Sequence, residues 1–229
     1  FTDIDTINNK KVLNLSNALD KDFVLKMKEI IVNRNDIEDE FINFVGIANI
    51  SVWHGYDRLL RSLRGYYLNN NNAKVNFHIV GEGKDIDNLK FLVKELNLQK
   101  NVFFHGLLNR DQIMNLINFS FIGVASLANH RRGLLGDKSL KNREYVAYGL
   151  PILKAGSDSF LDKKYRNILD IELNEKEFDL EKVLIDYYKL FNKASRKSMF
   201  ICNNHFAEKE LCWENELLKI VKEYQKWKK

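Results

Sequence analysis

The sequence predicts an α/β fold with a Rossmann-like parallel sheet flanked by helices. Short apolar runs alternate with segments of helical apolar spacing along most of the chain, which is typical of parallel strands joined by crossover helices. The 229 residues are 45% hydrophobic and 12% aromatic, enough for a substantial core. No run approaches the roughly 18 apolar residues of a membrane span, and the start shows no apolar signal core.

Six apolar runs are the expected strands, and four amphipathic segments are the helices that join them. Asn109 is the expected cap of the third of these helices, with Gln112 in the capping-box position. The strands are expected at Glu40–Ile47, Val75–Val80, Val102–His105, Phe121–Ser126, Ile152–Lys154 and Ile168–Ile171. The joining helices are expected at Tyr56–Leu68, Ile86–Leu96, Asp111–Ile117 and Leu140–Tyr148.

Helical spacing also predicts a helix before the first strand, over Asp22–Arg34, and two or three helices after the last. The final helix, Leu211–Trp227, is expected to turn one apolar face into the core. That face holds Trp213, Leu217, Ile220, Val221 and Tyr224. Both cysteines, Cys202 and Cys212, are expected to be buried free thiols, with a disulfide or a metal pair as the alternatives.

The segment Gly133–Ile152 joins a glycine loop, a short helix and a strand. Ser139 is a suitable N-cap, and Gly149 with Pro151 ends the helix. Lys138, Lys141 and Arg143 add positive charge at the helix start, where unpaired N–H groups already favour anions, so the pattern indicates a phosphate site. Glu144, one turn in, is placed to accept hydrogen bonds from a ribose diol. On charge alone, a solvated surface helix is the alternative.

The run Ser139, Glu144, Tyr145, Ala147, Gly149 and Pro151 resembles the donor-nucleotide motif S-x-x-x-x-E-Y-x-A-x-G-x-P of retaining GT-B glycosyltransferases, family-4-like and belonging to glycosyl transferases group 1. Three further segments resemble family landmarks in the expected order: Phe44–Leu60 the first strand and phosphate loop, Phe77–Gly83 the second strand and its turn, and Val102–Leu108 the third strand and the loop that meets the base. The likeness extends from about residue 40 to residue 225.

The resemblance implies the C-terminal, donor-binding half of a GT-B fold. Ligands of open parallel sheets bind at the carboxyl ends of the strands, where the candidate residues fall. The donor nucleotide would contact Glu144, Lys141, Ser139, Leu107 and Gly83, and the donor phosphate or sugar would contact His54, Gly55, Arg58, Arg131, Arg132 and Lys138. No catalytic residue is assigned. No metal and no cofactor are expected, because fixed cations and backbone N–H groups can stabilise a departing diphosphate.

The chain departs from the family pattern at three positions. Gly136 stands where the family has an acidic residue that meets the donor sugar, and Asp137 could replace that acid only by a changed loop path. Ile47 and His54 stand where an arginine and a lysine are usual. The expected compensation comes from Arg58, Arg131 and Arg132, while His54 either donates to phosphate, gains a proton beside it, or packs by Trp53 and Tyr56.

Residues 1–39 are expected to be an interdomain linker with a remnant of an N-terminal domain, and residues 40–229 the nucleotide-sugar-binding domain with C-terminal helices. The strand and polar residues of Lys11–Asp20 support this division, because in the resembled family such a segment leads from the first domain into the second. As a fragment, the chain is expected to bind nucleotide but to transfer no sugar.

The implied function is transfer of a sugar, hexose-like, from a nucleotide-diphosphate sugar to a glycan or lipid-linked acceptor in bacterial surface polysaccharide or capsule synthesis, with the acceptor bound through the missing N-terminal domain. The alternatives are a nucleotide-sugar epimerase on the same scaffold and a non-catalytic sugar-nucleotide-binding or scaffolding domain. Cytoplasmic location is expected, with peripheral contact at the inner membrane face as an option for the basic C-terminus. The net charge of +5 permits binding to nucleic acid, an anionic membrane face or a phosphorylated small molecule and does not choose among them. No nucleic-acid motif appears, and no nucleic-acid partner is expected.

Overall fold

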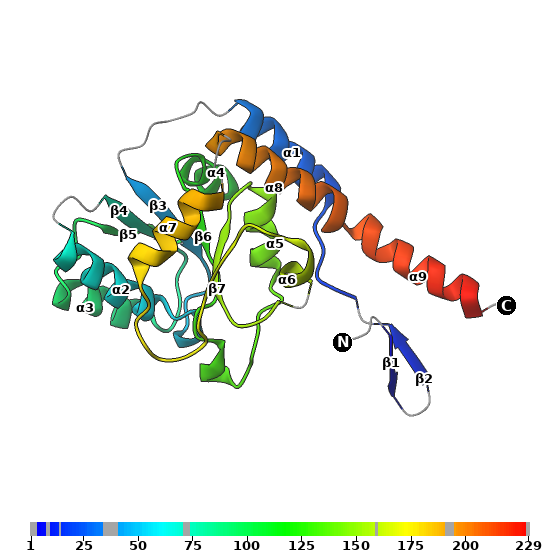
Figure 1. The fold of residues 1–229 in the computed structure, drawn as a ribbon, viewed down its shortest axis with the longest axis horizontal. Helices are drawn as coiled ribbons and strands as arrows, with labels where there is room; N and C mark the ends of the chain where they lie inside the picture. Colours follow the sequence, from blue (N-terminus) through cyan, green and yellow to red (C-terminus); the bar gives the residue numbers. More distant parts are fainter. Residues whose placement is uncertain are drawn as a thin grey trace.

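The computed structural model of the chain describes residues 4–7, 10–13, 15–33, 41–70, 74–158, 160–190 and 195–227. Its main sheet has six strands in the order β5-β4-β3-β6-β7-β8, and every neighbouring pair is parallel (Figure 1). The predicted Rossmann-like α/β fold is therefore confirmed. The six strands are β3 (Ile42–Ile47), β4 (Val75–Val80), β5 (Val102–Phe104), β6 (Ile122–Val124), β7 (Ile152–Ala155) and β8 (Ile168–Ile171).

The first strand of this sheet, β3, lies in its middle. Its residue Phe44 is in register with Phe77 of β4 on one side and with Ile122 of β6 on the other. The chain therefore builds outward from β3 in one direction and then, after β5, crosses to build in the other. The strand order reverses between β3 and β6, and in open α/β sheets a crevice for ligands forms at that point, outside the carboxyl ends of the strands.

Helices cover both faces of the sheet. One group is α2, with α3 and α7 against it, and the other is α5, α8 and α1, which pack together (Figure 1). The helices are α1 (Lys21–Asn33), α2 (Tyr56–Asn69), α3 (Ile86–Glu95), α4 (Arg110–Asn118), α5 (Leu140–Ala147), α6 (Leu161–Lys164), α7 (Leu180–Leu190), α8 (Arg196–Glu210) and α9 (Trp213–Trp227). Two 3₁₀ turns are η1 (Val52–His54) and η2 (Asn129–Arg132), and β1 (Ile4–Ile7) pairs antiparallel with β2 (Lys10–Leu13).

A local sequence signal sets the start of α4. The Asn109 side chain accepts from the Gln112 amide at 2.9 Å, and the Gln112 side chain accepts from the Asn109 amide at 2.9 Å. The predicted capping box at the start of α4 is thus confirmed, and it satisfies two amides that a helix start leaves unpaired. The predicted beginning of the first strand at Glu40, and the proposed domain boundary beside it, lie outside the described residues.

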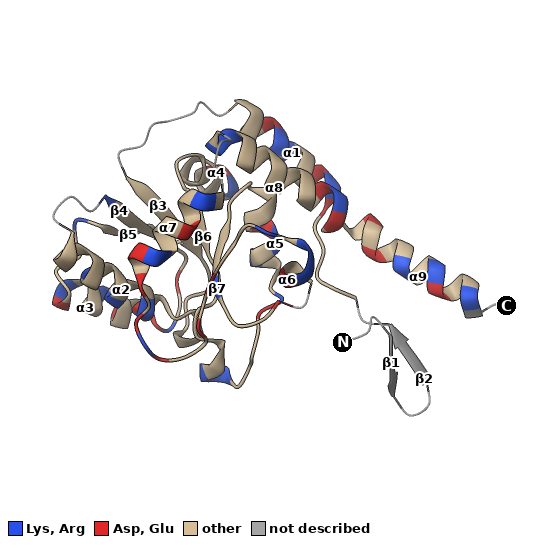
Figure 2. Ribbon diagram, viewed as in Figure 1, with Lys and Arg blue, Asp and Glu red and all other residues tan. Residues whose placement is uncertain are grey.

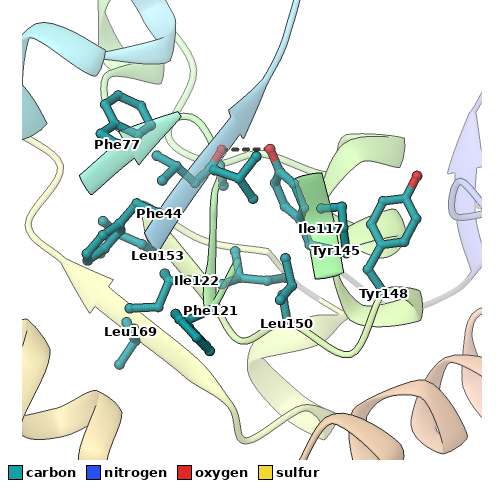
Figure 3. Close-up of a cluster of buried hydrophobic side chains, with 14 of the residues drawn as sticks. Phe44, Phe77, Ile117, Phe121, Ile122, Tyr145, Tyr148, Leu150, Leu153 and Leu169 are labelled. Atoms are coloured by element: carbon teal, nitrogen blue, oxygen red, sulfur yellow. Dashed lines mark hydrogen bonds between the residues drawn. The ribbon is translucent and has the colours of Figure 1, made fainter. Parts of the chain in front are cut away.

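The core lies between the sheet and its helices. Phe44 and Phe77 are fully buried beneath α2, where the Tyr56 ring meets Phe77 edge-on at a centroid distance of 5.2 Å. On the other face, Tyr145 of α5 points toward the strands and lies close to Ile117 (Figure 3), and a Cβ on Gly123 of β6 would lie 2.5 Å from its ring. Burial of such aromatic and branched side chains supplies the main stabilisation of the domain.

The last helix does not pack as predicted. Trp213, Leu217, Ile220, Val221 and Tyr224 are 39–54% exposed, and α9 runs away from the sheet as a straight extension of α8 (Figure 1). Its buried contact is instead polar: Glu216 is 2% exposed and accepts from the Ser16 amide at 3.1 Å. The apolar period correctly predicted a helix, but a period cannot say which surface covers the apolar face.

The cysteine prediction is partly wrong. Both thiols are free, but Cys202 is exposed and Cys212 alone is buried. Cys202 sits at an exposed position of α8.

Basic and acidic residues are spread along α9 (Figure 2). Within the part of the chain described above, every helix is too short or too polar to cross a membrane.

Candidate nucleotide site

Two loops meet outside the carboxyl ends of β3 and β6. The Leu127 amide donates to the His54 carbonyl at 2.9 Å, and the Ala128 amide donates to the Trp53 carbonyl at 3.2 Å. These bonds join the loop after β6 to the loop that leads into α2. Gly55 completes the turn with φ +65°, a left-handed conformation that glycine adopts without strain, and a Cβ there would lie 2.9 Å from the Ala128 nitrogen. The two loops are therefore closely packed against each other at the point between β3 and β6 where the strand order reverses, which is called the switch point below.

A pocket of about 660 Å³ opens beside this crevice, at the carboxyl ends of β3, β4 and β5. Its wall is mostly apolar, as expected for a planar organic group, with backbone and a few polar groups at its edge. Gly83 and Leu107, both predicted for the donor nucleotide, line it together, and Leu107 is 79% exposed. The full lining is Ile47, Ala48, Asn49, Val80, Gly81, Glu82, Gly83, Leu107, Leu108 and Ile113.

The predicted start of α5 is confirmed, because the helix begins at Leu140 with Ser139 as its N-cap residue. The Ser139 hydroxyl makes no bond to the helix amides and lies 3.2 Å from oxygens of both Asp137 and Asn142. The buried Asp137 carboxylate accepts from the Ser139 amide at 2.9 Å. This carboxylate therefore fixes the loop on which the first helical amides are presented.

Lys141 lies in the first turn of α5 with a covered ammonium group. The residue as a whole is partly exposed, but its Nζ has no contact with solvent and no hydrogen-bond partner among the described residues. Burial lowers the pKa of Lys141 to about 8, with Arg132 acting in the same direction and Asp137 against it. A buried ammonium without a partner is costly, so this position favours an anionic ligand.

His54 is close to Lys141 and is neutral. Burial, together with the charge of Lys141, lowers its pKa to about 3, so the prediction that His54 gains a proton does not apply to the free protein. Its Nδ1 lies 3.1 Å from the Ser51 amide nitrogen and 3.2 Å from the Ser51 carbonyl oxygen. Because the amide always carries a proton, Nδ1 is assigned as its acceptor and the ring proton to Nε2. The ring also packs beside Trp53 and Tyr56, at centroid distances of 5.9 and 5.7 Å. Donation from Nε2 is the contact that remains for a ligand.

The predicted basic cluster divides into exposed and buried members. Arg132, on η2, is exposed, lies over the Trp53 ring at 5.4 Å and lowers the pKa values of His54 and Lys141. Lys138 is exposed as well. Arg143 is fully buried and bonds Asp158 at 3.3 Å and the Ser139 carbonyl at 3.0 Å, so it supports the helix start from within and does not face the loop.

Glu144 lies on α5, partly buried beside α4. Burial raises its pKa, and the nearby charge of Arg110 at the start of α4 counters that rise. The next residue, Tyr145, accepts from the amide of Ile47 at 2.8 Å. Because Ile47 and Ile113 of α4 both line the apolar pocket, Glu144 belongs to the same edge of the sheet as that pocket.

Arg58 has a structural role. It is 1% exposed and donates to the carbonyls of Lys176, Glu172 and Leu127 and to the side chain of Asn174. The prediction that Arg58 reaches the phosphates is therefore wrong: its guanidinium is turned into the protein, where it fastens α2 to the segment after β8. Three of these four partners are more than 100 residues away along the chain, which is why sequence spacing gave no sign of them.

Arg58→Leu should lower the free energy of unfolding by about 2 to 4 kcal/mol, because buried carbonyls would lose their donor. Denaturant unfolding measures this loss. At a temperature where the variant is still folded, its nucleotide affinity should equal that of the wild type, and a selective loss of diphosphate affinity would restore the phosphate role of Arg58.

Arg131 is also engaged by protein groups, in this case carboxylates. Its guanidinium pairs with Asp57 at 2.7 Å and with Glu175 at 2.6 Å. The expected contact of Arg131 with donor phosphate is not supported, because two acidic residues already hold it.

Gly136 has no room for a side chain. A Cβ there would lie 2.0 Å from the Ser157 carbonyl oxygen, so this position cannot carry the family's acidic side chain without a shift of the backbone.

Sequence reasoning missed two residues that shape the site. The sequence predicts Asp137 only as a substitute acid, although an aspartate readily bonds the backbone two residues further on. The motif includes Tyr145 but gives no role to its buried hydroxyl, which accepts from the Ile47 amide and donates to the Val124 carbonyl at 3.2 Å. No local pattern could have revealed that contact, since its partners are 98 and 21 residues away.

A family model described as "Glycosyl transferases group 1" matches residues 27–154, which is more than half of the chain. No curated protein matches the chain significantly. The chain is also similar to solved structures of glycosyltransferases at identities that show the fold alone.

A glycosyltransferase from Rickettsia africae has a TM-score of 0.66 and 15% identity, over 96% of this chain and 58% of that protein. TarM of S. aureus, solved with fondaparinux, α-GlcNAc-glycerol and UDP, has a TM-score of 0.64 and 16% identity, over 94% of this chain and 40% of that protein. HepE of Anabaena, solved with UDP, has a TM-score of 0.63 and 13% identity, over 93% of this chain and 57% of that protein. The chain thus spans little more than half the length of these proteins, or less.

Proposed function

Because the chain belongs to the glycosyl transferases group 1 family, we propose that it is the donor-binding domain of a retaining glycosyltransferase. It binds a nucleotide-diphosphate sugar, and a hexose is transferred to a glycan or lipid-linked acceptor held by another part of the protein. The process is assembly of a bacterial surface polysaccharide, such as capsule, on the cytoplasmic side of the membrane, with peripheral membrane contact as part of the proposal. Neither a cofactor nor a metal is required in this proposal.

The observation that carries the proposal is the covered ammonium of Lys141 at the start of α5, which has no partner among the described residues, together with an apolar pocket of about 660 Å³ at the carboxyl ends of the strands. The pocket suits a base and ribose, and the helix start with Lys141 and Arg132 suits a diphosphate. These two parts lie at the same edge of the sheet. A nucleoside diphosphate has the same arrangement, an apolar planar end joined to a compact anion.

Chemically, departure of a nucleoside diphosphate requires stabilisation of growing negative charge on its phosphate oxygens. Lys141, Arg132 and the amides at the start of α5 are placed to provide that stabilisation, and the neutral His54 supplies a donor from Nε2. Glu144, by the family resemblance, accepts from the ribose hydroxyls. Burial raises the pKa of the Glu144 carboxyl. In its ionised form this carboxyl has two oxygens, which can accept hydrogen bonds from two hydroxyl groups.

A non-catalytic sugar-nucleotide-binding domain is the second candidate. It is favoured by the missing acid at Gly136, where the backbone of Ser157 excludes a side chain, and by the absence of fixed charge at Ile47 and at the neutral His54. Such a domain would bind the nucleotide as proposed, but it would not promote transfer in the complete protein.

Titration of the folded chain with UDP, GDP and ADP by calorimetry tests the proposal, with uridine, guanosine and adenosine as matched ligands without phosphate. One diphosphate should bind more tightly than its nucleoside, and the difference should shrink in high salt because the phosphate contacts are electrostatic. Failure of all three diphosphates to bind would reject the nucleotide-binding function in both of its forms.

Glu144→Gln should weaken binding of both UDP and uridine by about 1 to 3 kcal/mol, because charge-assisted hydrogen bonds to the ribose diol become neutral and mismatched. The fold should persist, since the described residues give this carboxylate no structural hydrogen bond. Calorimetry with 2′,3′-dideoxyuridine is the control: it should not distinguish the variant from the wild type. Equal uridine affinity of wild type and variant would remove Glu144 from the site.

A further inference from the structure

We propose that Arg131 is a positioning residue, which clamps the loops after β3, β6 and β8 together and so holds Arg132 and His54 toward the start of α5. The proposal deepens the function proposed above and rests on it. It replaces the predicted direct contact of Arg131 with phosphate by an indirect role. The two roles predict opposite changes in UDP affinity for Glu175→Gln.

The guanidinium of Arg131 has no N–H left for a ligand. Its Nη1 donates to Asp57 at 2.7 Å and to the Val52 carbonyl at 2.8 Å, and its Nη2 donates to Asp57 at 2.8 Å and to Glu175 at 2.6 Å. Its Nε donates to both Glu175 oxygens at 3.1 Å. A guanidinium has five N–H groups, and these contacts use all five.

The partners come from three separate segments. Val52 belongs to η1 after β3, Asp57 to the first turn of α2, and Glu175 to the segment between β8 and α7. Arg131 itself lies on η2 after β6, next to His130, whose Nε2 is 2.5 Å from Glu175. One side chain therefore fastens together the loops that surround the crevice at the switch point.

The charge balance also argues against a direct phosphate contact. Two carboxylates surround one guanidinium, so this group of residues offers an incoming diphosphate no net positive charge. The pairing raises the pKa of Arg131 and lowers that of Glu175 to about 2, so the ion pairs remain intact over the physiological range. Bidentate contacts of this kind fix geometry as well as charge.

Arg132, the next residue, is what the clamp presents to the ligand. Its Nε donates to Asn129 at 3.0 Å, which turns the guanidinium over Trp53, and its charge acts on both His54 and Lys141. The η2 turn that carries it is held by the Arg131 amide, which donates to the Ala128 carbonyl at 3.0 Å. Loss of the clamp would leave the charge of Arg132 in place but no longer fix its position.

Three variants test the proposal: Arg131→Lys, Glu175→Gln and, as a control, Glu210→Gln, which removes an exposed ion pair of 2.6 Å with Lys164 outside the site. Each is titrated with UDP and with uridine after circular dichroism has shown that it is folded. Glu175 is 60% exposed, so its variant should fold even if Arg131→Lys does not. We expect UDP affinity to fall about 10-fold in Arg131→Lys and about threefold in Glu175→Gln, with uridine affinity and the control unchanged.

A direct phosphate contact predicts the opposite sign for Glu175→Gln, because removal of a competing carboxylate would free Arg131 and tighten UDP binding. A tighter complex therefore overturns the positioning role. An Arg131→Lys variant with the UDP affinity of the wild type also overturns the positioning role.

The substitution is then repeated in an Arg132→Gln background. A positioning residue acts through Arg132, so Arg131→Lys should have little further effect there, whereas an equal effect in both backgrounds contradicts the proposal. If the wild type binds none of UDP, GDP and ADP, the proposed function fails and the clamp has no ligand site to position. If the wild type binds UDP and only the variants disagree, the clamp alone is rejected.

Discussion

Lys141→Met should weaken UDP binding by about 2 to 3 kcal/mol, roughly 30- to 160-fold, with uridine affinity almost unchanged. The ammonium of Lys141 has no partner among the described residues, so its binding contribution is reserved for an anion at the start of α5. Methionine keeps the length and apolar stem of the side chain. The free energy of unfolding should stay equal or rise, because a buried unpaired charge is removed. Calorimetry measures the loss of UDP affinity, and denaturant unfolding measures the change in the free energy of unfolding.

The same residue predicts a pH dependence. The pKa of Lys141 in the free protein is about 8, and a bound diphosphate would raise it. As pH rises through 8, the free protein loses the proton that the complex needs, so UDP affinity should fall above pH 8 by up to about tenfold per unit and stay level below it as far as this group is concerned. In Lys141→Met that decline should be missing. Parallel pH profiles of variant and wild type would remove Lys141 from the diphosphate site.

Lys141 also makes the stability of the free protein depend on pH, and this dependence is opposite in sign to that of UDP affinity. The folded pKa of Lys141 lies below its ordinary value of 10.5, so the unfolded chain binds more protons between about pH 8 and pH 10.5. Stability contributed by this group therefore rises with pH across that window. Binding becomes weaker there while the free fold becomes more stable, a combination that general alkaline unfolding would not produce.

Asp158→Ala should lower the free energy of unfolding by about 3 to 5 kcal/mol, because it leaves the fully buried guanidinium of Arg143 without its carboxylate. Two more nitrogens of Arg143, Nε and Nη2, already have no partner among the described residues. The Asp158 side chain also accepts from the amides of Phe160 and Leu161, each at 3.1 Å, at the start of α6. Chemical denaturation gives the loss directly.

Asp170→Ala is the matched control for this change. Asp170 also forms an ion pair on the neighbouring strand, with Lys154 at 3.2 Å, but it is 62% exposed. Its removal should cost less than about 1 kcal/mol. Equal losses in the two variants would show that burial does not determine the strength of the Asp158 contact. Replacing Arg143 and Asp158 together by apolar residues should recover part of the loss, since neither charge is then left alone.

Signals confined to a few neighbouring residues predicted the fold well. The capping box at Asn109 and the alternation of apolar runs depend only on local geometry, so β4 and β8 begin and end where the sequence indicated. The same holds for the stop of α5 near Gly149, whose amide donates to the Val146 carbonyl at 2.9 Å. Such features need no knowledge of the rest of the chain.

The roles of charged side chains could not be predicted in this way. Arg58 and Arg131 both follow loops of the expected site, and a sequence shows only that they are basic there. Their partners include Lys176 and Glu175, 118 and 44 residues away, and these contacts decide whether a guanidinium faces a ligand or the protein. The exposed apolar face of α9 is a similar case, because its period is a local property and its covering surface is not.

The Tyr145 hydroxyl lies between the ends of β3 and β6, at the edge of the sheet where the crevice begins. The Tyr145 hydroxyl accepts a hydrogen bond from the Ile47 amide and donates one to the Val124 carbonyl. The backbone ladder between the two strands can therefore end early without leaving an unpaired group. At this edge the two strands are therefore bridged by a side chain. Tyr145→Phe keeps the ring but removes the hydroxyl, which leaves the Ile47 amide and the Val124 carbonyl without their common partner at the ligand-binding edge of the sheet.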